Sequence, residues 1–223
     1  MNRIQIPIFE LDNVRVAYNG RTVLKIGKFQ FHRGTIYGIV GPVGSGKTTL
    51  LKVLTGRIVP TDGEILYENE PFEKNWLGRI KPLPEVVFLE SDVSTHKGTV
   101  SEFISSRLPK NYEEVRRRYY SNSRHSSEWD LSMDALSSGL RYRANLIAAI
   151  ESDPKVLIID DYAKNFDLKL KREFNRRIRQ NAKSRGTTVI ISTTDMSPIR
   201  DLATVIIFLD NGHISKVRSQ KNQ

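Results

Sequence analysis

Eight consecutive residues in the first quarter of the chain have the types and spacing of a phosphate-binding loop. They place glycine at the first and sixth positions and then Lys and Thr, and they read Gly41-Pro42-Val43-Gly44-Ser45-Gly46-Lys47-Thr48. The glycines let the backbone curl so that several N–H groups point at one phosphate. Lys47 supplies positive charge to the β- and γ-phosphates, and the Thr48 hydroxyl is suited to ligate Mg²⁺. We expect this loop, with Thr49, to bind ATP and Mg²⁺; the alternative is an ordinary glycine turn.

A second candidate group follows a buried strand. Val156-Leu157-Ile158-Ile159 is a short apolar run, and Asp160 comes directly after it. In a parallel sheet such a carboxylate lies beside the phosphate loop and can hold Mg²⁺ through water. The simpler interpretation is an acidic residue that only ends a strand, but the loop upstream favours the metal role.

Alternating strands and helices position these groups. Residues 35–40 form a β-branched strand before the loop, and residues 48–55 have helical composition and end at Gly56. Further strands are expected at 9–18, 23–31, 64–67, 86–89, 156–159, 187–192 and 204–209, and further helices at 140–151 and 168–183. This order predicts an α/β fold, a P-loop NTPase core with a mainly parallel sheet. The hairpin-linked strands at the start should form an antiparallel edge subdomain.

The segment 91–135 differs from its surroundings because apolar runs thin out and charged, helix-compatible residues dominate. We expect it to be a helical subdomain inserted into a single domain, 1–223. Arg116, Arg117 and Arg118 within it form either a solvated helix face or a surface for an anionic membrane or a partner. Trp76 and Trp129 are expected to be packing residues, and the four histidines lack metal-ligand spacing.

Composition narrows the protein class. Hydrophobic residues make up 39%, enough for a core, and cysteine is absent, which fits a reducing cytoplasm. The start of the chain lacks the apolar stretch of a secretory signal, and no run of about 18 apolar residues predicts a membrane-spanning helix. The net charge of +10 favours an anionic partner or simply a well-solvated surface.

Several segments, in one order, resemble the ABC ATPase family over about residues 9–215. Leu136-Ser137-Ser138-Gly139-Leu140-Arg141 is similar to that family's signature, Leu-Ser-Gly-Gly-Gln-Arg, and 152–161 resembles its Walker B segment. The turn at 61–65, the D-loop-like Asn165-Phe166-Asp167, the switch segment 192–195 and Tyr18 at the adenine-stacking position complete the set.

The resemblance implies a head-to-tail dimer that holds two ATP molecules. Ser137, Ser138 and Gly139 of one chain would cap the γ-phosphate bound to the loop of the other, because small residues at a helix start let the backbone approach an anion. Tyr18 would stack on adenine, although it could equally be a strand aromatic that packs on the sheet.

Four family positions are altered, and all bear on catalysis. Asp161 stands where the family has its catalytic Glu, and Thr194 stands where it has the switch His. Glu90 occupies the Q-loop position, from which it could still meet Mg²⁺ or the attacking water. In the signature, Ser138 replaces the first glycine. We therefore expect tight ATP binding and slow hydrolysis, or a site completed by a partner.

The resemblance favours an ATP-binding subunit of an ABC transporter, in the cytoplasm and peripherally attached to the inner face of the cell membrane. Its partners would be a transmembrane subunit, docked near Glu90, and a second ATPase chain in a homodimer or heterodimer. One alternative is a non-transport protein that acts on nucleic acid or ribosomes, which the net charge of +10 favours. Another is a regulatory cassette that binds ATP and barely hydrolyses it.

Overall fold

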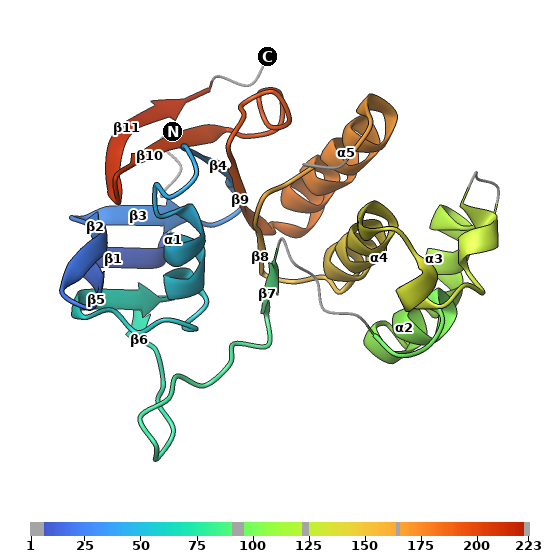
Figure 1. The fold of residues 1–223 in the computed structure, drawn as a ribbon, viewed down its shortest axis with the longest axis horizontal. Coiled ribbons are helices and arrows are strands. Elements are labelled where there is room, and N and C mark those ends of the chain that lie inside the picture. The colour runs from blue at the N-terminus through green and yellow to red at the C-terminus, as the bar shows by residue number, and fades with distance from the viewer. Residues whose placement is uncertain (1–6, 91–95, 122–124, 164–165, 221–223) are drawn as a thin grey trace.

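Two β-sheets and the helix between them form the centre of the molecule (Figure 1). The computed structural model describes residues 7–90, 96–121, 125–163 and 166–220. Helix α1 (Lys47–Leu54) buries its apolar face in one core that also includes residues of both sheets. Helices α4 (Ser138–Glu151) and α5 (Leu168–Arg185) cover the other face of the larger sheet in a second core. The mixed α/β fold expected from the sequence is confirmed.

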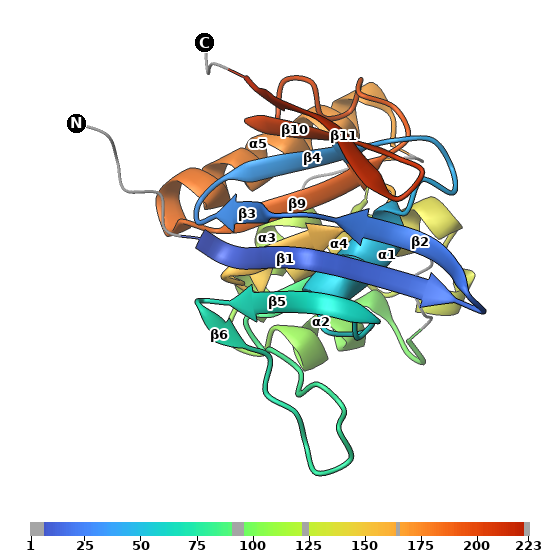
Figure 2. The same cartoon turned by 90° about the vertical axis from the view of Figure 1, so that its left-hand side faces the viewer.

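The smaller sheet is antiparallel and is seen face-on in Figure 2. It runs β2-β1-β5-β6, with β3 also paired to β1, and consists of β1 (Pro7–Tyr18), β2 (Arg21–Ile26), β3 (Phe29–His32), β5 (Asp62–Tyr67) and β6 (Glu70–Pro71). The prediction of a single strand at 23–31 is wrong, because residues 27–28 interrupt it and separate β2 from β3. The 12-residue β1 is long enough to pair with β2 along one half and β3 along the other.

The larger sheet carries the strands that lead to the candidate site. Its order is β11-β10-β4-β9-β8-β7, and all neighbours are parallel except β10 and β11. The strands are β4 (Ile36–Val40), β7 (Val86–Leu89), β8 (Val156–Ile159), β9 (Thr188–Thr193), β10 (Val205–Asp210) and β11 (His213–Ser219). The antiparallel edge of this sheet is therefore β11, whereas the strands at the start of the chain form a sheet of their own.

Burial on both faces explains the continuous apolar runs of the central strands. Val156 and Ile158 of β8 pack in the core with α1, whereas Leu157 and Ile159 pack in the core with α4 and α5. A strand covered on both sides needs apolar residues at every position rather than at alternate ones. Because β7, β8, β9, β4 and β10 run parallel, their carboxyl ends all reach the edge of the sheet where the phosphate-type loop begins.

The inserted segment forms a helical layer beyond α4 (Figure 1). It contains α2 (Val100–Arg107), α3 (Tyr112–Tyr119) and 3₁₀ turns at Ser126–Glu128 and Met133–Ala135. Residues 91–95 and 122–124 of the expected subdomain lie outside the described residues. Arg143 of α4 and Glu128 form a buried ion pair, 3.2 Å between Nη1 and Oε2, that ties this layer to α4.

The arginine run of α3 has mixed surroundings. Arg118 pairs with Glu114 and with the buried Glu151, and Arg116 lies over the ring of Trp129. Trp129 is buried, as expected for a packing residue, and Arg117 is exposed. The three arginines therefore do not share one free cationic face. Among the described residues, no helix is both long and apolar enough to cross a membrane.

Candidate nucleotide-binding site

The turn between β4 and α1 requires glycine at several positions for steric reasons. A Cβ at Gly41 would lie 2.2 Å from the carbonyl oxygen of Leu209 and 2.6 Å from Ser45 Oγ, closer than real contacts allow. Gly46, the N-cap of α1, has a φ of 99°, and Gly44 has a φ of 81°. Only glycine adopts such values without strain. The loop therefore brings the positive end of α1 to the surface with no side-chain cap.

Lys47 fills the middle of the loop. Its Nζ donates hydrogen bonds to the carbonyl oxygens of Gly41 at 2.8 Å and Pro42 at 2.9 Å, and the residue is buried. Burial lowers the pKa of the Lys47 ammonium below its ordinary value, while the negative charges of Asp161 and Asp160 oppose that shift. A buried cation held by two carbonyls, close to two acids, is ready to exchange these bonds for phosphate oxygens.

Asp160 connects the loop to the neighbouring strand. Its Oδ2 accepts a hydrogen bond from Thr48 Oγ1 at 2.8 Å, and its Oδ1 accepts one from Ser192 Oγ. Ser192 Oγ also accepts the N–H of Asp161 at 3.0 Å. Ser192 was not among the candidate site residues predicted from the sequence. It could have been found from the pairing of β8 and β9, because these strands are adjacent and parallel and a polar residue near the end of β9 therefore lies beside the end of β8.

A cavity of about 670 Å³ lies over the loop. Candidate residues that line it are Val43, Gly44, Gly46, Lys47, Thr48, Thr49, Asp161 and Thr194. Gly41 and Ser45 are buried in the loop, Pro42 is exposed there, and Asp160 is buried behind Thr48. Lys171 of α5 and Asp195 also line the cavity and were not predicted; Lys171 lies one turn into a helix whose position the sequence did indicate.

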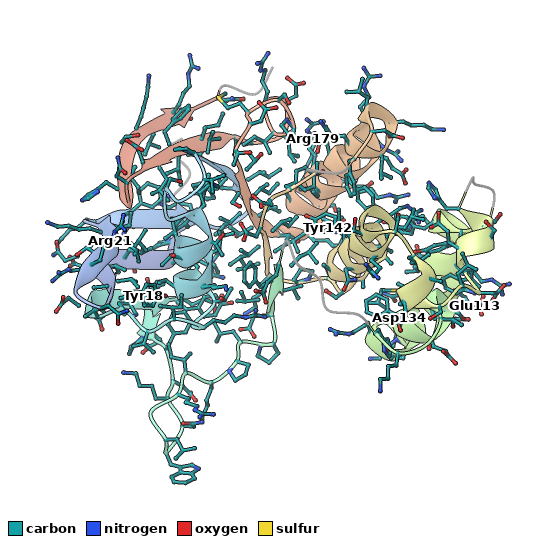
Figure 3. The ribbon with its side chains drawn as sticks, in the orientation of Figure 1. Tyr18, Arg21, Glu113, Asp134, Tyr142 and Arg179 are labelled. Carbon is teal, nitrogen blue, oxygen red and sulfur yellow. The ribbon has the colours of Figure 1, made fainter. Side chains whose placement is uncertain are left out.

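The other candidate residues lie outside the lining of this cavity. Tyr18 is half exposed at the end of β1, on the antiparallel sheet (Figure 3). The Glu90 carboxylate pairs with Arg57 and, at 3.7 Å, with Lys52. Ser137 caps α4 by accepting the N–H of Leu140 at 3.3 Å, so this helix begins at Ser138, two residues before the expected start. Asn165 of the D-loop-like segment lies outside the described residues.

The residues around the loop fit a nucleoside triphosphate with Mg²⁺. Ser45 Oγ is buried with no hydrogen-bond partner in the described part of the chain, and such an orphan is suited to a phosphate oxygen. The Thr48 hydroxyl and the Asp160 carboxylate are the oxygen ligands that Mg²⁺ prefers. Within residues 7–90, 96–121, 125–163 and 166–220, no three acidic or histidine side chains cluster around a metal position, so phosphate oxygens would have to complete the ligand set.

Two further features surround the two aspartates. Tyr142 of α4 is 7% exposed, and its hydroxyl has no hydrogen-bond partner among the residues that the structure describes. Burial raises the pKa of this phenol, and the charges of Asp160 and Asp161 raise it further, so it stays protonated. Asp161 has a φ of 48°, a left-handed conformation that Asp tolerates better than most residues.

Comparison with known proteins identifies the family. The chain matches the ABC transporter family over residues 24–164, which is more than half of its 223 residues. The chain belongs to this family. It is 30% identical, over 92% of this chain and 76% of the relative, to the energy-coupling factor transporter ATP-binding protein EcfA1 of Methanospirillum hungatei.

Other relatives are longer or more distant. Identity is 27% to the spermidine/putrescine import ATP-binding protein PotA of Mycoplasma capricolum, over 94% of this chain. This chain spans only 61% of the length of that relative. It is 25% identical to the lantibiotic transport ATP-binding protein SrtF of Streptococcus pyogenes, over 93% of this chain and 89% of the relative.

Solved structures confirm the fold. The chain matches cbiO1 of Clostridium perfringens, part of the ABC transporter complex cbiONQ, with a TM-score of 0.80 and 21% identity over 96% of this chain and 89% of the other. It also matches a bacterial Atm1-family ABC exporter with ATP bound, with a TM-score of 0.81 and 22% identity over 96% of this chain and 39% of the other. Membership of the family implies ATP binding and, in general, ATPase activity.

Proposed function

We propose that this chain is the ATP-binding subunit of an ABC transporter or related membrane machine, and that it binds MgATP tightly but hydrolyses it slowly. The observation that carries the proposal is the cavity in which Lys47 and Thr48 of the loop, with Asp160 behind them, face Asp161 and Thr194. The binding half of this set is complete. The half that would break the bond departs from the family pattern.

The loop residues bind and orient the phosphates in this proposal. Lys47 leaves the carbonyls of Gly41 and Pro42 and neutralises the β- and γ-phosphates, while the N-terminus of α1 points its N–H groups at the same oxygens. Thr48 and Asp160 would hold Mg²⁺, and the ion would supply positive charge against the charge that develops on the phosphates. Ser192 fixes the orientation of the Asp160 carboxylate.

Slow hydrolysis follows from the residues that would act on water. Asp161 can accept a proton, but it is one methylene shorter than the family's Glu, and misplacement by about 1 Å can cost roughly a hundredfold in rate. Thr194 can donate a hydrogen bond but carries no positive charge. The Glu90 carboxylate pairs with Arg57 and Lys52, and these two cations compete with Mg²⁺ for its oxygens.

A dimer and a membrane partner belong to the same proposal. Ser137, Ser138 and Gly139 lie outside the lining of this chain's own cavity, which supports their use on the nucleotide of a second ATPase chain. A transmembrane subunit docked near Glu90 would hold the protein at the inner face of the cell membrane. The chain itself offers no membrane-spanning helix among its described residues.

Nucleotide titration tests the binding step directly. The wild-type chain should bind MgATP with micromolar or tighter affinity, and chelation of Mg²⁺ by EDTA should weaken binding. Lys47→Ala should weaken binding at least about a hundredfold, whereas Lys25→Ala, which changes an exposed lysine of β2, should leave it intact. Wild-type turnover near 10 per second, the ordinary enzyme range, would contradict slow hydrolysis.

A second candidate function rests on α5. Its exposed face carries five basic side chains at helical spacing: Lys169, Arg172, Arg176, Arg179 and Lys183. A cationic stripe of this kind suits the phosphate backbone of a nucleic acid. A gel shift with RNA or duplex DNA that weakens steeply with salt, and is lost on charge reversal of Arg172 and Arg176, would favour this function over transport.

A further inference from the structure

A protruding hairpin ends in two exposed apolar side chains. The segment 72–84, between β6 and β7, projects from the body of the molecule in both cartoon views (Figures 1 and 2). At its tip Trp76 is 90% exposed and Leu77 is 56% exposed, whereas Trp129, the other tryptophan, is 4% exposed. The expectation that Trp76 is a packing residue is therefore wrong. Two adjacent large apolar side chains in solvent form a candidate binding surface at this tip.

The tip is structurally defined by its own hydrogen bonds. The Asn75 side-chain oxygen accepts the N–H groups of Leu77 and Arg79, both at 3.0 Å. The Asn75 backbone N–H donates to the Arg79 carbonyl at 2.8 Å, and the Gly78 N–H donates to the Asn75 carbonyl at 2.9 Å. These bonds close a tight turn that fixes where Trp76 and Leu77 point, so the entropic cost of presenting them is already met before binding.

The base of the hairpin is anchored to the body. Ile80 packs closely on Gly56: a Cβ added at Gly56 would lie 2.5 Å from Ile80 Cγ2. Phe72 is buried and stacks on Tyr67 of the antiparallel sheet, with ring centroids 6.5 Å apart. The hairpin is consequently a fixed arm rather than a loose loop end.

The charges around the tip are positive. Residues 74–81 contain Lys74, Arg79 and Lys81 and no acid. Lys81 pairs with Glu73 at 2.8 Å, near the base, which leaves Lys74 and Arg79 beside the apolar tip. A tryptophan and a leucine flanked by two cations is the combination that inserts into the headgroup region of an anionic bilayer.

From this geometry we infer that the hairpin 72–84 docks on an anionic lipid surface, with Trp76 and Leu77 inserted at the headgroup level and Lys74 and Arg79 on lipid phosphates. A protein interface is the weaker alternative. A stable protein contact buries about 800 Å² on each partner around a central cluster, which is far more than two side chains on a narrow arm offer. A lipid surface needs only an apolar anchor and cations.

The position of the arm agrees with this role. Gly56, which receives Ile80, is followed by Arg57, whose guanidinium lies over Phe88 and pairs with Glu90. The arm therefore projects from the part of the molecule where the proposed transmembrane subunit would dock. This orientation rests on the proposed function, whereas binding to vesicles can be measured on the isolated chain without ATP.

Vesicle binding with the chain's own tryptophans as reporters tests the inference. Vesicles of phosphatidylcholine with about one third phosphatidylglycerol should shift tryptophan emission to the blue, because Trp76 leaves water while Trp129 is already buried. Vesicles of pure phosphatidylcholine should give a much smaller shift, and a rise from 0.1 to about 0.5 M salt should weaken binding to the anionic ones. The Trp76→Ala variant lacks the fluorescent reporter, so its binding is measured by sedimentation with the vesicles. This variant should bind the anionic vesicles far less than the wild type does.

Charge-reversed variants separate a local effect from the net charge of +10. Lys74→Glu/Arg79→Glu should bind the anionic vesicles on the order of 25-fold more weakly, at about fivefold or more for each basic residue lost. Lys216→Glu/Arg218→Glu, on exposed positions of β11, makes the same change in net charge and should bind like the wild type. Val217→Ala on the same strand is the matched control for Trp76→Ala.

Three outcomes overturn the inference. One is the absence of an emission shift and of sedimentation with anionic vesicles. Another is an equal loss in the two charge-reversed pairs, which would mean attraction by overall charge alone. The third is a wild-type chain that ignores vesicles while Trp76→Ala loses co-purification with a membrane protein, because the hairpin would then dock on protein. Retained ATP binding in the hairpin variants shows that a loss of vesicle binding is independent of the nucleotide site.

Discussion

Replacement of Asp161 by Glu should raise ATP turnover. Asp161 lines the cavity opposite the phosphate loop, and its backbone N–H donates to Ser192 Oγ at 3.0 Å, so the variant keeps this anchor and lengthens the reach of the carboxylate. One methylene extends that reach by about 1.5 Å, and errors of about 1 Å can cost roughly a hundredfold in rate. We expect kcat to rise about ten- to a hundredfold.

The same substitution should cost a little stability. Asp161 has a φ of 48°, and Asp tolerates this left-handed conformation better than Glu because its short side chain bonds locally. A penalty of up to about 1 kcal/mol corresponds to a fall of roughly 2–4 °C in Tm for a chain of this size. Faster turnover in a slightly less stable protein is a combination that a general improvement in folding would not produce.

Steady-state phosphate release at saturating MgATP measures the effect, with nucleotide affinity determined separately for each variant. Asp161→Asn keeps the size of the side chain and removes the charge, so it should fall below the wild type. Thr194→His added to Asp161→Glu should raise kcat again, because an imidazolium carries charge to the γ-phosphate. A kcat within about twofold of the wild type for Asp161→Glu, with affinity unchanged, would refute the reasoning.

Three further variants test the loop and the packing. Lys47→Ala should weaken MgATP affinity at least about a hundredfold, measured by calorimetry, because a buried charge-assisted contact is lost. Gly41→Ala should abolish nucleotide binding or unfold the loop, since its Cβ would lie 2.2 Å from a backbone oxygen, whereas Gly27→Ala, with nothing within 4 Å, should be tolerated; calorimetry and thermal unfolding report both. Arg143→Met should cost about 2–3 kcal/mol in urea unfolding, because it removes the buried guanidinium that pairs with Glu128 and donates to the Tyr119 carbonyl, while His125 still contacts that carboxylate. Arg185→Ala, which breaks an exposed pair, should cost less than about 1 kcal/mol.

Short-range backbone requirements made the phosphate site readable from the sequence. Gly46 has to be glycine because of its own φ angle of 99°, and a Cβ at Gly41 would meet Ser45 of the same loop as well as the distant Leu209. Lys47 and Thr48 follow at fixed offsets. Asp160 was predictable because an apolar run of four residues indicates a central parallel strand buried on both faces. The residue that follows such a strand lies at the carboxyl edge of the sheet. The family resemblance then predicted the roles of segments that carry no such local signal.

The positions of the strands were predicted better than their pairing. A single strand at 23–31 was expected because its residues are uniformly strand-forming, but β2 and β3 are separate and share β1 as a neighbour. The sheet to which the early strands belong is likewise decided by which apolar faces cover α1. Strand propensity describes a segment, whereas pairing depends on partners many residues away.

The sequence by itself determined the loop, its cation, its hydroxyl and the acid that meets them, because fixed spacing and backbone geometry impose these. Only the tertiary structure placed Ser192 on Asp160, added Lys171 to the cavity, and paired Glu90 with Arg57. It also left Trp76 in solvent, although tryptophan is usually at least partly buried. Side-chain exposure and long-range pairing follow from which strands become neighbours and how far a turn projects, and no local pattern encodes either.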